Sequence, residues 1–101
     1  PQAVGDVPSW DFTGTADSDF LMTLLDSLQT KYNIDPNRIY STGFSQGGAM
    51  SYVFACKYSS RIAAVAPVAG GMNGTSDCKP IHYMPLMHVH GTDDMLASYS
   101  D

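Results

Sequence analysis

The fold of this chain is decided by residues 38–48, which read Arg38-Ile39-Tyr40-Ser41-Thr42-Gly43-Phe44-Ser45-Gln46-Gly47-Gly48. A short run suited to a strand leads into three glycines that surround a single serine. The pattern predicts a strand over 38–42, a tight turn over 43–48 and a helix over about 46–58. In such a strand–turn–helix setting, Gly-x-Ser-x-Gly places the serine hydroxyl at a sharp and exposed bend.

This turn supplies two of the parts that an acyl-transfer reaction needs. Ser45 is the predicted nucleophile, and the backbone N–H of Gln46 is the predicted donor to the oxyanion of a tetrahedral intermediate. Gly43 and Gly47 lack a Cβ, so we expect the strand and the helix to approach each other closely there. The alternative is a glycine-rich turn without chemistry, of the kind that binds a phosphate at a helix N-terminus.

The rest of the chain predicts an alternation of helices and strands. A loop over 1–16 precedes a helix that Asp17 could cap, with a strand expected over Ile62–Ala69 despite Pro67. A break over 70–74 is followed by a strand over 86–90 and a loop over 91–94. Such alternation indicates a parallel sheet covered by helices. The expected apolar face of the first helix comprises Phe20, Leu21, Leu24, Leu25 and Leu28.

The carboxylate that would complete the reaction site lies downstream of Ser45. Asp94 follows a predicted strand, at the sheet edge where catalytic groups collect, and its neighbour Asp93 competes for the same role. In folds that carry a Gly-x-Ser-x-Gly turn of this kind, the catalytic histidine follows the acid in sequence. His82, His88 and His90 all precede Asp94. We therefore expect all three to be structural and the catalytic histidine to lie outside this chain, beyond Asp101.

Composition excludes several classes of partner. Hydrophobic residues make up 44% of the 101 residues, charged residues 15%, and the net charge is −5. A nucleic-acid groove needs clustered positive charge, and five lysines and arginines do not supply it. An acidic membrane surface is disfavoured for the same reason, and no apolar run approaches the roughly 20 residues of a membrane span. Cys56 and Cys78 could form one disulfide or be two separate buried thiols.

Taken together, these motifs resemble the extracellular poly(3-hydroxybutyrate) depolymerase family, which includes feruloyl and acetylxylan esterases. The resemblance lies in four stretches and covers most of residues 17–99: Tyr32 to Tyr52, Ala64 to Met72, Cys78-Lys79-Pro80 and His90-Gly91-Thr92-Asp93-Asp94. The stretch Gly-Phe-Ser-Gln-Gly-Gly is also similar to cytosolic carboxylesterases and acyl-protein thioesterases, although the surrounding residues fit that family less well.

The resemblance assigns the catalytic acid to Asp94 and makes Asp93 a variable position. It places His90 at a strand end and not in the role of base. It also implies secretion, which favours a Cys56–Cys78 disulfide. The sequence departs from the family pattern at Ser98, where a proline is expected near the loop that carries Asp94.

These observations predict a partial α/β-hydrolase catalytic domain over residues 1–101, with a mostly parallel sheet and helices on both faces. The expected function of the complete, secreted protein is serine ester hydrolysis without metal or cofactor. Its expected substrate is an ester, polymeric or not, of feruloylated or acetylated xylan or of a hydroxyalkanoate polyester. The alternatives are a non-catalytic α/β-hydrolase-like binding module, a cytosolic carboxylesterase or thioesterase, and a serine peptidase. We expect this segment alone to be inactive and poorly stable, because it would leave sheet edges open. Its oligomeric state cannot be read from the sequence.

Overall fold

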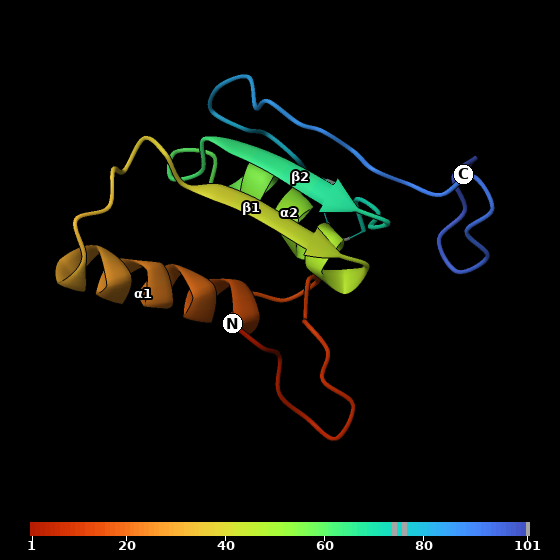
Figure 1. The fold of residues 1–101 in the computed structure, drawn as a ribbon, viewed down its shortest axis with the longest axis horizontal. Helices are drawn as coiled ribbons and strands as arrows, with labels where there is room; N and C mark the ends of the chain where they lie inside the picture. Colours follow the sequence, from red (N-terminus) through yellow and green to blue (C-terminus); the bar gives the residue numbers. More distant parts are fainter. Residues whose placement is uncertain (74, 76, 101) are drawn as a thin grey trace.

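The computed structural model describes residues 1–73, 75 and 77–100, and it contains two helices and a parallel two-stranded sheet. Along the chain these are α1 (Ala16–Lys31), β1 (Tyr40–Phe44), α2 (Gln46–Lys57) and β2 (Ala64–Val68). Figure 1 shows α2 behind the two strands, with α1 running along the side of β1. The predicted order of helix, strand, helix and strand is therefore confirmed. Gly74, the last residue of the predicted break, lies outside the described residues.

The first helix begins earlier than the sequence suggests. Thr15 is the residue at its N-terminal cap, without a side-chain capping bond, so the expectation that Asp17 caps the helix is wrong. Asp17 lies in the first turn, and its carboxylate accepts the backbone N–H of Asp11 at 2.6 Å. A negative charge in the first turn still interacts favourably with the helix dipole. The loop before α1 is thus fastened to the helix by the residue expected to start it.

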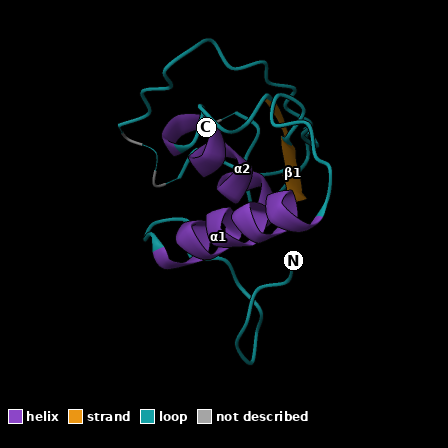
Figure 2. Cartoon of the chain, turned by 90° about the vertical axis from the view of Figure 1, so that its left-hand side faces the viewer, coloured by secondary structure: helices purple, strands orange, loops and turns teal. Residues whose placement is uncertain are grey.

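The buried stripe of α1 is rotated from the predicted one. Ser18 and Met22 are its buried residues, whereas Phe20 is 51% exposed and Leu28 36% exposed. The helix packs on α2 (Figure 2), where the Tyr58 hydroxyl contacts Ser18 Oγ at 3.3 Å. Ser18 and Met22 thus face inward, with Met22 in the apolar core and Leu21 and Leu25 packed against that core.

Helix α2 is the centre of the core. Every residue from Gly48 to Cys56 is buried, because α2 packs on both strands and α1 covers another side. The core cluster that it organises comprises Met22, Met50, Val53, Phe54, Ala55, Ile62 and Val65. Only one of the two sheet faces has helical cover among the described residues, and Tyr40 and Phe44 on the other face are exposed. A helix over that second face stays a prediction.

The predicted strand over 86–90 is present only as two isolated parallel bridges, Val65 to Leu86 and Val68 to Val89. Backbone bonds from Met87 N–H to the Val65 oxygen (3.1 Å) and from Val89 N–H to the Pro67 oxygen (3.0 Å) hold it beside β2. Between the bridges stands Pro67, which has no N–H to donate and so interrupts the ladder. The segment follows the path expected of a third parallel strand, but it is not a continuous one.

Candidate active site

Ser45 stands at a strained bend between β1 and α2. It is the residue at the N-terminal cap of α2, with φ 55° and ψ −114°, and it is exposed. Positive φ is unfavourable for a residue with a side chain and persists only where the surroundings enforce it. Here the backbone N–H of Ser45 donates to the Val68 carbonyl oxygen (2.8 Å), and the Ser45 carbonyl oxygen accepts the Ala49 N–H (3.0 Å). The predicted strand–turn–helix context of the motif is confirmed.

The glycines around Ser45 differ in whether a side chain would fit at their positions. A Cβ added at Gly43 would lie 2.4 Å from the Gly47 carbonyl carbon, so the close approach requires glycine at position 43. A Cβ at Gly47 would meet nothing within 4 Å, so the expectation that Gly47 also serves this approach is wrong. The second tight contact is between Gly48 and Gly70, where a Cβ on Gly70 would lie 2.6 Å from the Ala49 nitrogen. The first turn of α2 therefore packs closely against Gly43 of β1 and against Gly70, which follows β2.

Gln46 is the first residue of α2, next to Ser45. The first N–H groups of a helix have no partner within it and carry the positive end of its dipole. The amide at this position is therefore suited to hold negative charge, and its role as oxyanion donor stays a prediction. The Gln46 side chain is engaged separately, because its Oε1 accepts the backbone N–H of Trp10 at 3.0 Å.

A groove of about 870 Å³ runs beside Ser45. Its walls come from the N-terminal loop, from α1 and from β1, and they are largely apolar. Phe44, Ser45, Gln46 and Gly47 line it at the candidate nucleophile, and Trp10 joins them from the N-terminal loop. An exposed hydroxyl at the side of an apolar groove can meet the acyl or alcohol part of an ester.

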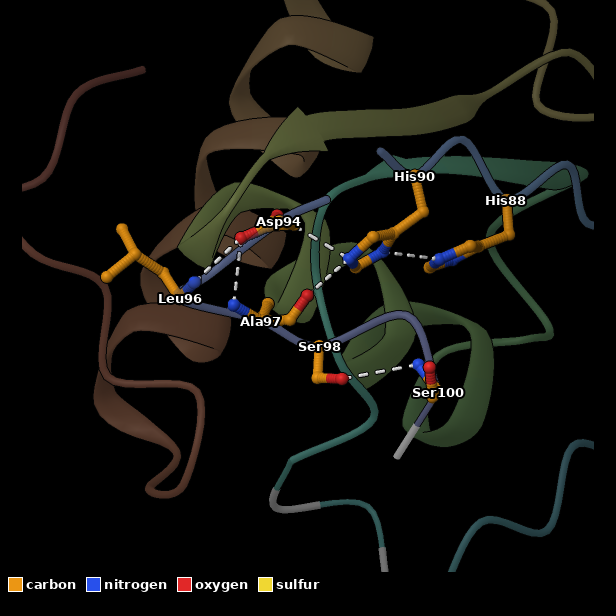
Figure 3. Close-up of polar contacts among 7 residues, drawn as sticks. All are labelled: His88, His90, Asp94, Leu96, Ala97, Ser98 and Ser100. Carbon is orange, nitrogen blue, oxygen red and sulfur yellow. Dashed lines mark hydrogen bonds and ion pairs between the residues drawn. The ribbon is translucent and has the colours of Figure 1, made fainter. Parts of the chain in front are cut away.

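Asp94 is held by the loop that it belongs to (Figure 3). Its Oδ1 accepts the N–H groups of Leu96 and Ala97, both at 2.9 Å, while Oδ2 lies 3.5 Å from His90 Nε2. The Ala97 N–H, the Leu96 N–H and the nearby His90 lower the pKa of the Asp94 carboxyl from its ordinary value. Asp94 is therefore a fixed carboxylate at neutral pH. The departure at Ser98 leaves these bonds in place, and Ser98 Oγ accepts the Ser100 N–H at 3.3 Å.

Ser45 and Asp94 line separate grooves that share Phe44, the last residue of β1. The second groove lies at the carboxyl ends of the strands and includes Val68, Val89, His90 and Asp93. Both predicted catalytic residues thus face the same edge of the sheet. Their roles, and the choice of Asp94 over Asp93, stay predictions.

The Cys56–Cys78 disulfide is formed, as the resemblance to secreted esterases implied. It joins the last turn of α2 to the loop after β2, with 22 residues of sequence separation. Because α2 begins at Gln46, directly after Ser45, the bridge restrains the far end of the helix that carries the candidate oxyanion donor.

The contacts of three residues near the candidate site do not follow from any sequence motif. Trp10 contacts Gln46 through its backbone, which no side-chain pattern can reveal. Tyr52 and His88 join His90 in a hydrogen-bonded chain, with Tyr52 Oη 2.6 Å from His88 Nδ1. A signal for the histidine pair was available, because residues i and i+2 of an extended segment point to the same side.

The fold and this turn define an α/β-hydrolase, in which a strand leads into a strained and exposed serine at the start of a helix. A family model described as phospholipase/carboxylesterase matches residues 13–100. The chain therefore belongs to the phospholipase/carboxylesterase family.

Individual relatives are acetylxylan and feruloyl esterases by name. The chain is 35% identical to a bifunctional acetylxylan esterase/xylanase of Neocallimastix patriciarum, over 98% of the chain and 15% of that protein. It is 34% identical to feruloyl esterase B of Piromyces equi, over 87% of the chain and 17% of that protein. It is 33% identical to a probable feruloyl esterase C of Aspergillus terreus, over 84% of the chain and 31% of that protein.

The chain thus spans less than a third of the length of these three relatives. The relatives confirm the resemblance to feruloyl and acetylxylan esterases, and the family description agrees with the carboxylesterase resemblance. The resemblance to polyester depolymerases stays a prediction. No helix in the described part of the chain is both long and apolar enough to cross a membrane.

Proposed function

We propose that the protein containing this chain is a serine carboxylic ester hydrolase that works through an acyl-enzyme. The observation that carries the proposal is the backbone of Ser45, which is held at φ 55° and exposed at the start of α2. Strain of this kind costs roughly 1–3 kcal/mol and is characteristic of functional turns. Membership of a phospholipase/carboxylesterase family supports the same reaction.

In the proposed mechanism, Ser45 Oγ attacks the ester carbonyl carbon. A histidine outside residues 1–101 takes the serine proton and is oriented by the Asp94 carboxylate. The Gln46 N–H and a second donor outside the chain stabilise the oxyanion. Collapse of the intermediate passes the proton from the histidine to the departing alcohol and leaves the acyl group on Ser45. Water then gives a proton to the histidine as it attacks the acyl carbon, and the proton returns to Ser45 Oγ as the acid is released.

The proposed substrates are feruloyl or acetyl esters of xylan, with hydroxyalkanoate polyesters as a third class. The names of the relatives support the first two classes. The open apolar groove beside Ser45, with Trp10 in its wall, is suited to an aromatic acyl group or a polymer segment. The Cys56–Cys78 disulfide supports an oxidising compartment, and we propose that the enzyme is extracellular.

The test is S45A in the full-length protein, assayed on methyl ferulate, acetylated xylan and a short 3-hydroxybutyrate ester. We expect turnover to fall by roughly 10⁴-fold or more, since removing the nucleophile disables the catalytic group as a unit. The matched control is S60A, at an exposed serine in the turn after α2, which should keep full turnover. An aryl phosphonate should also label Ser45 covalently.

Retained turnover in S45A would refute the role of Ser45. Inactivity of the wild-type protein on every ester would refute the hydrolase proposal. Binding of xylan without turnover would then point to the binding module, and cleavage of peptides to the peptidase.

A further inference from the structure

A continuous chain of polar contacts links α2 to the Asp94 loop. Tyr52 Oη lies 2.6 Å from His88 Nδ1, His88 Nε2 lies 2.9 Å from His90 Nδ1, and His90 Nε2 lies 2.6 Å from the Ala97 carbonyl oxygen. The two histidine rings are inclined by only 17°, which suits an in-plane bond between their nitrogens. Figure 3 shows the histidines and the loop beyond them. We call Tyr52, His88 and His90 the Tyr–His–His chain.

The far end of this chain fixes one proton, and the contacts along it then set the order of the others for two neutral rings. The Ala97 carbonyl oxygen can only accept a hydrogen bond, so His90 Nε2 must carry a hydrogen. His90 Nδ1 is then free to accept from His88 Nε2–H, which leaves His88 Nδ1 to accept from the Tyr52 hydroxyl. One proton on each ring satisfies all three contacts, and both imidazoles have a defined tautomer.

His90 Nε2, whose hydrogen is donated to the Ala97 carbonyl, also lies 3.5 Å from Asp94 Oδ2, close enough for an electrostatic contact with the carboxylate. Oδ1 is already occupied by the N–H groups of Leu96 and Ala97. Asp94 is thereby held by hydrogen bonds at Oδ1, with His90 beside Oδ2, and its loop is restrained at the Ala97 carbonyl. The His90 side chain is only 5% exposed, so water does not easily replace these contacts. Tyr99 is the further ring beside His90, at 6.0 Å between centroids.

We propose that His90 is a positioning residue for the Asp94 carboxylate, and that Tyr52 and His88 hold His90 in the required tautomer. The inference rests on the proposed function, in which Asp94 orients the catalytic histidine. Because Tyr52 lies on α2, two turns after Ser45, the chain would keep the acid loop in a constant relation to the helix that begins at the nucleophile. In this arrangement His90 is not itself the base, because Nδ1 accepts from His88 and Nε2 carries a hydrogen.

The first test compares H90L with H90Q in the full-length enzyme. H90L keeps a side chain of moderate size but has no donor, and we expect kcat per titrated active serine to fall roughly 10- to 100-fold, as for other residues that orient a catalytic group. Its KM should change little. A poorly oriented carboxylate stabilises the imidazolium less, so the acid limb of the pH profile should move to lower pH. H90Q keeps an N–H donor and should recover most of the turnover and the original acid limb.

The second test uses two tyrosines of the same region. Y52F removes the hydroxyl that ends the chain, and we expect kcat to fall about fivefold, the effect of one net hydrogen bond. Y58F removes a hydroxyl that contacts Ser18 and Asp19 instead, and it should leave kcat and the pH profile unchanged.

Wild-type turnover and an unshifted acid limb in H90L would overturn the inference. Equal losses in H90L and H90Q, or in Y52F and Y58F, would also overturn it, since they would indicate general destabilisation. These outcomes are separable from failure of the proposed function, which would appear as retained turnover in S45A.

Discussion

The backbone N–H of Trp10 donates to Gln46 Oε1 across 36 residues of sequence, at 3.0 Å. This bond attaches the N-terminal loop to the residue that follows Ser45. Trp10 and the preceding residues of that loop line the groove beside Ser45. The Gln46 side chain therefore holds one wall of the groove, and the proposed oxyanion donor is a different group of the same residue, its backbone amide.

Removal of this attachment should affect binding more than chemistry. We expect Q46M in the full-length enzyme to raise KM about threefold to tenfold while kcat stays within about twofold, since the loss of uniform binding raises KM alone. Steady-state kinetics on methyl ferulate measures both. Q29M, on α1, is the matched control and should leave KM unchanged. A fall in kcat at constant KM would contradict this role for the Gln46 side chain.

The two glycines of the motif should respond in opposite ways to alanine. In G43A the new Cβ would meet the backbone of Gly47, which cannot move aside, so we expect a loss of roughly 2–4 kcal/mol in the free energy of unfolding. In G47A the Cβ enters open space on a helix, and stability should stay equal or rise by about 0.5–1 kcal/mol. Urea unfolding of both variants measures the difference, and equal destabilisation would contradict the packing described for Gly43.

Asp94 and Asp93 can be distinguished by paired amide substitutions. D94N keeps an oxygen that can accept the Leu96 and Ala97 N–H groups, so the loop should fold, but kcat should fall roughly 10³- to 10⁴-fold because the charge is lost. D93N, at an exposed neighbouring position, should stay within about twofold of the wild-type kcat. The reverse order of effects would transfer the role of catalytic acid to Asp93.

The protonation of Asp94 also sets a direction for the stability of its loop. The pKa of Asp94 is lowered in the folded state, so the stabilisation is present above the unfolded pKa and is lost as pH falls through the folded pKa.

The disulfide should contribute substantially to stability. Closure of a loop with 22 residues of sequence separation restrains the unfolded chain by about 3 kcal/mol at room temperature. We therefore expect the double variant C56A/C78A to unfold at a lower urea concentration than the wild type. A reducing agent should lower the wild-type midpoint in the same way and leave the midpoint of the double variant unchanged. An unchanged midpoint in the double variant would contradict the expected contribution.

His82 should make stability depend on pH. Its Nδ1 lies 3.0 Å from the Tyr83 oxygen and its Nε2 lies 2.6 Å from the Ser59 oxygen, and both carbonyls only accept. These bonds to the Tyr83 and Ser59 carbonyls raise the pKa of His82. Since the folded pKa exceeds the unfolded one, the stabilisation is complete below the unfolded pKa and is lost as pH rises through the folded pKa.

The comparison is the free energy of unfolding of wild type and H82A at about pH 5.5 and about pH 9, on either side of the ordinary histidine pKa. At the lower pH we expect the free energy of unfolding to be larger for the wild type than for H82A. At the higher pH we expect the two free energies to converge. A constant difference at both pH values would contradict this assignment.

The motif and the order of elements could be predicted from the sequence because each depends on local chemistry. The helix after Ser45 extends over Gln46–Lys57, within one residue of the prediction. The strand before it starts at Tyr40 instead of Arg38, because the ladder begins where Tyr40 pairs with Ala64. The disulfide followed from the resemblance and not from the two cysteines alone.

The errors arise where long-range contacts override local signals. Asp is a residue type that often caps helices, but the Asp17 carboxylate accepts the backbone N–H of Asp11 instead. No local sequence pattern indicates this contact. The buried face of α1 depends on the position of Tyr58, 40 residues away from Ser18. The partners of His88 and His90 come from α2 and from the Asp94 loop, so spacing alone could indicate that they share a side but not what they hold.

Pro67 in β2 removes one hydrogen bond from the ladder that joins β2 to the segment over residues 86–90. With Val65 opposite Leu86 and Val68 opposite Val89, Pro67 stands opposite His88. The missing amide of Pro67 therefore leaves the backbone around His88 less tightly fastened to the sheet than the residues on either side. The side chain of His88, through Tyr52 and His90, supplies at this point the anchorage that the backbone ladder lacks.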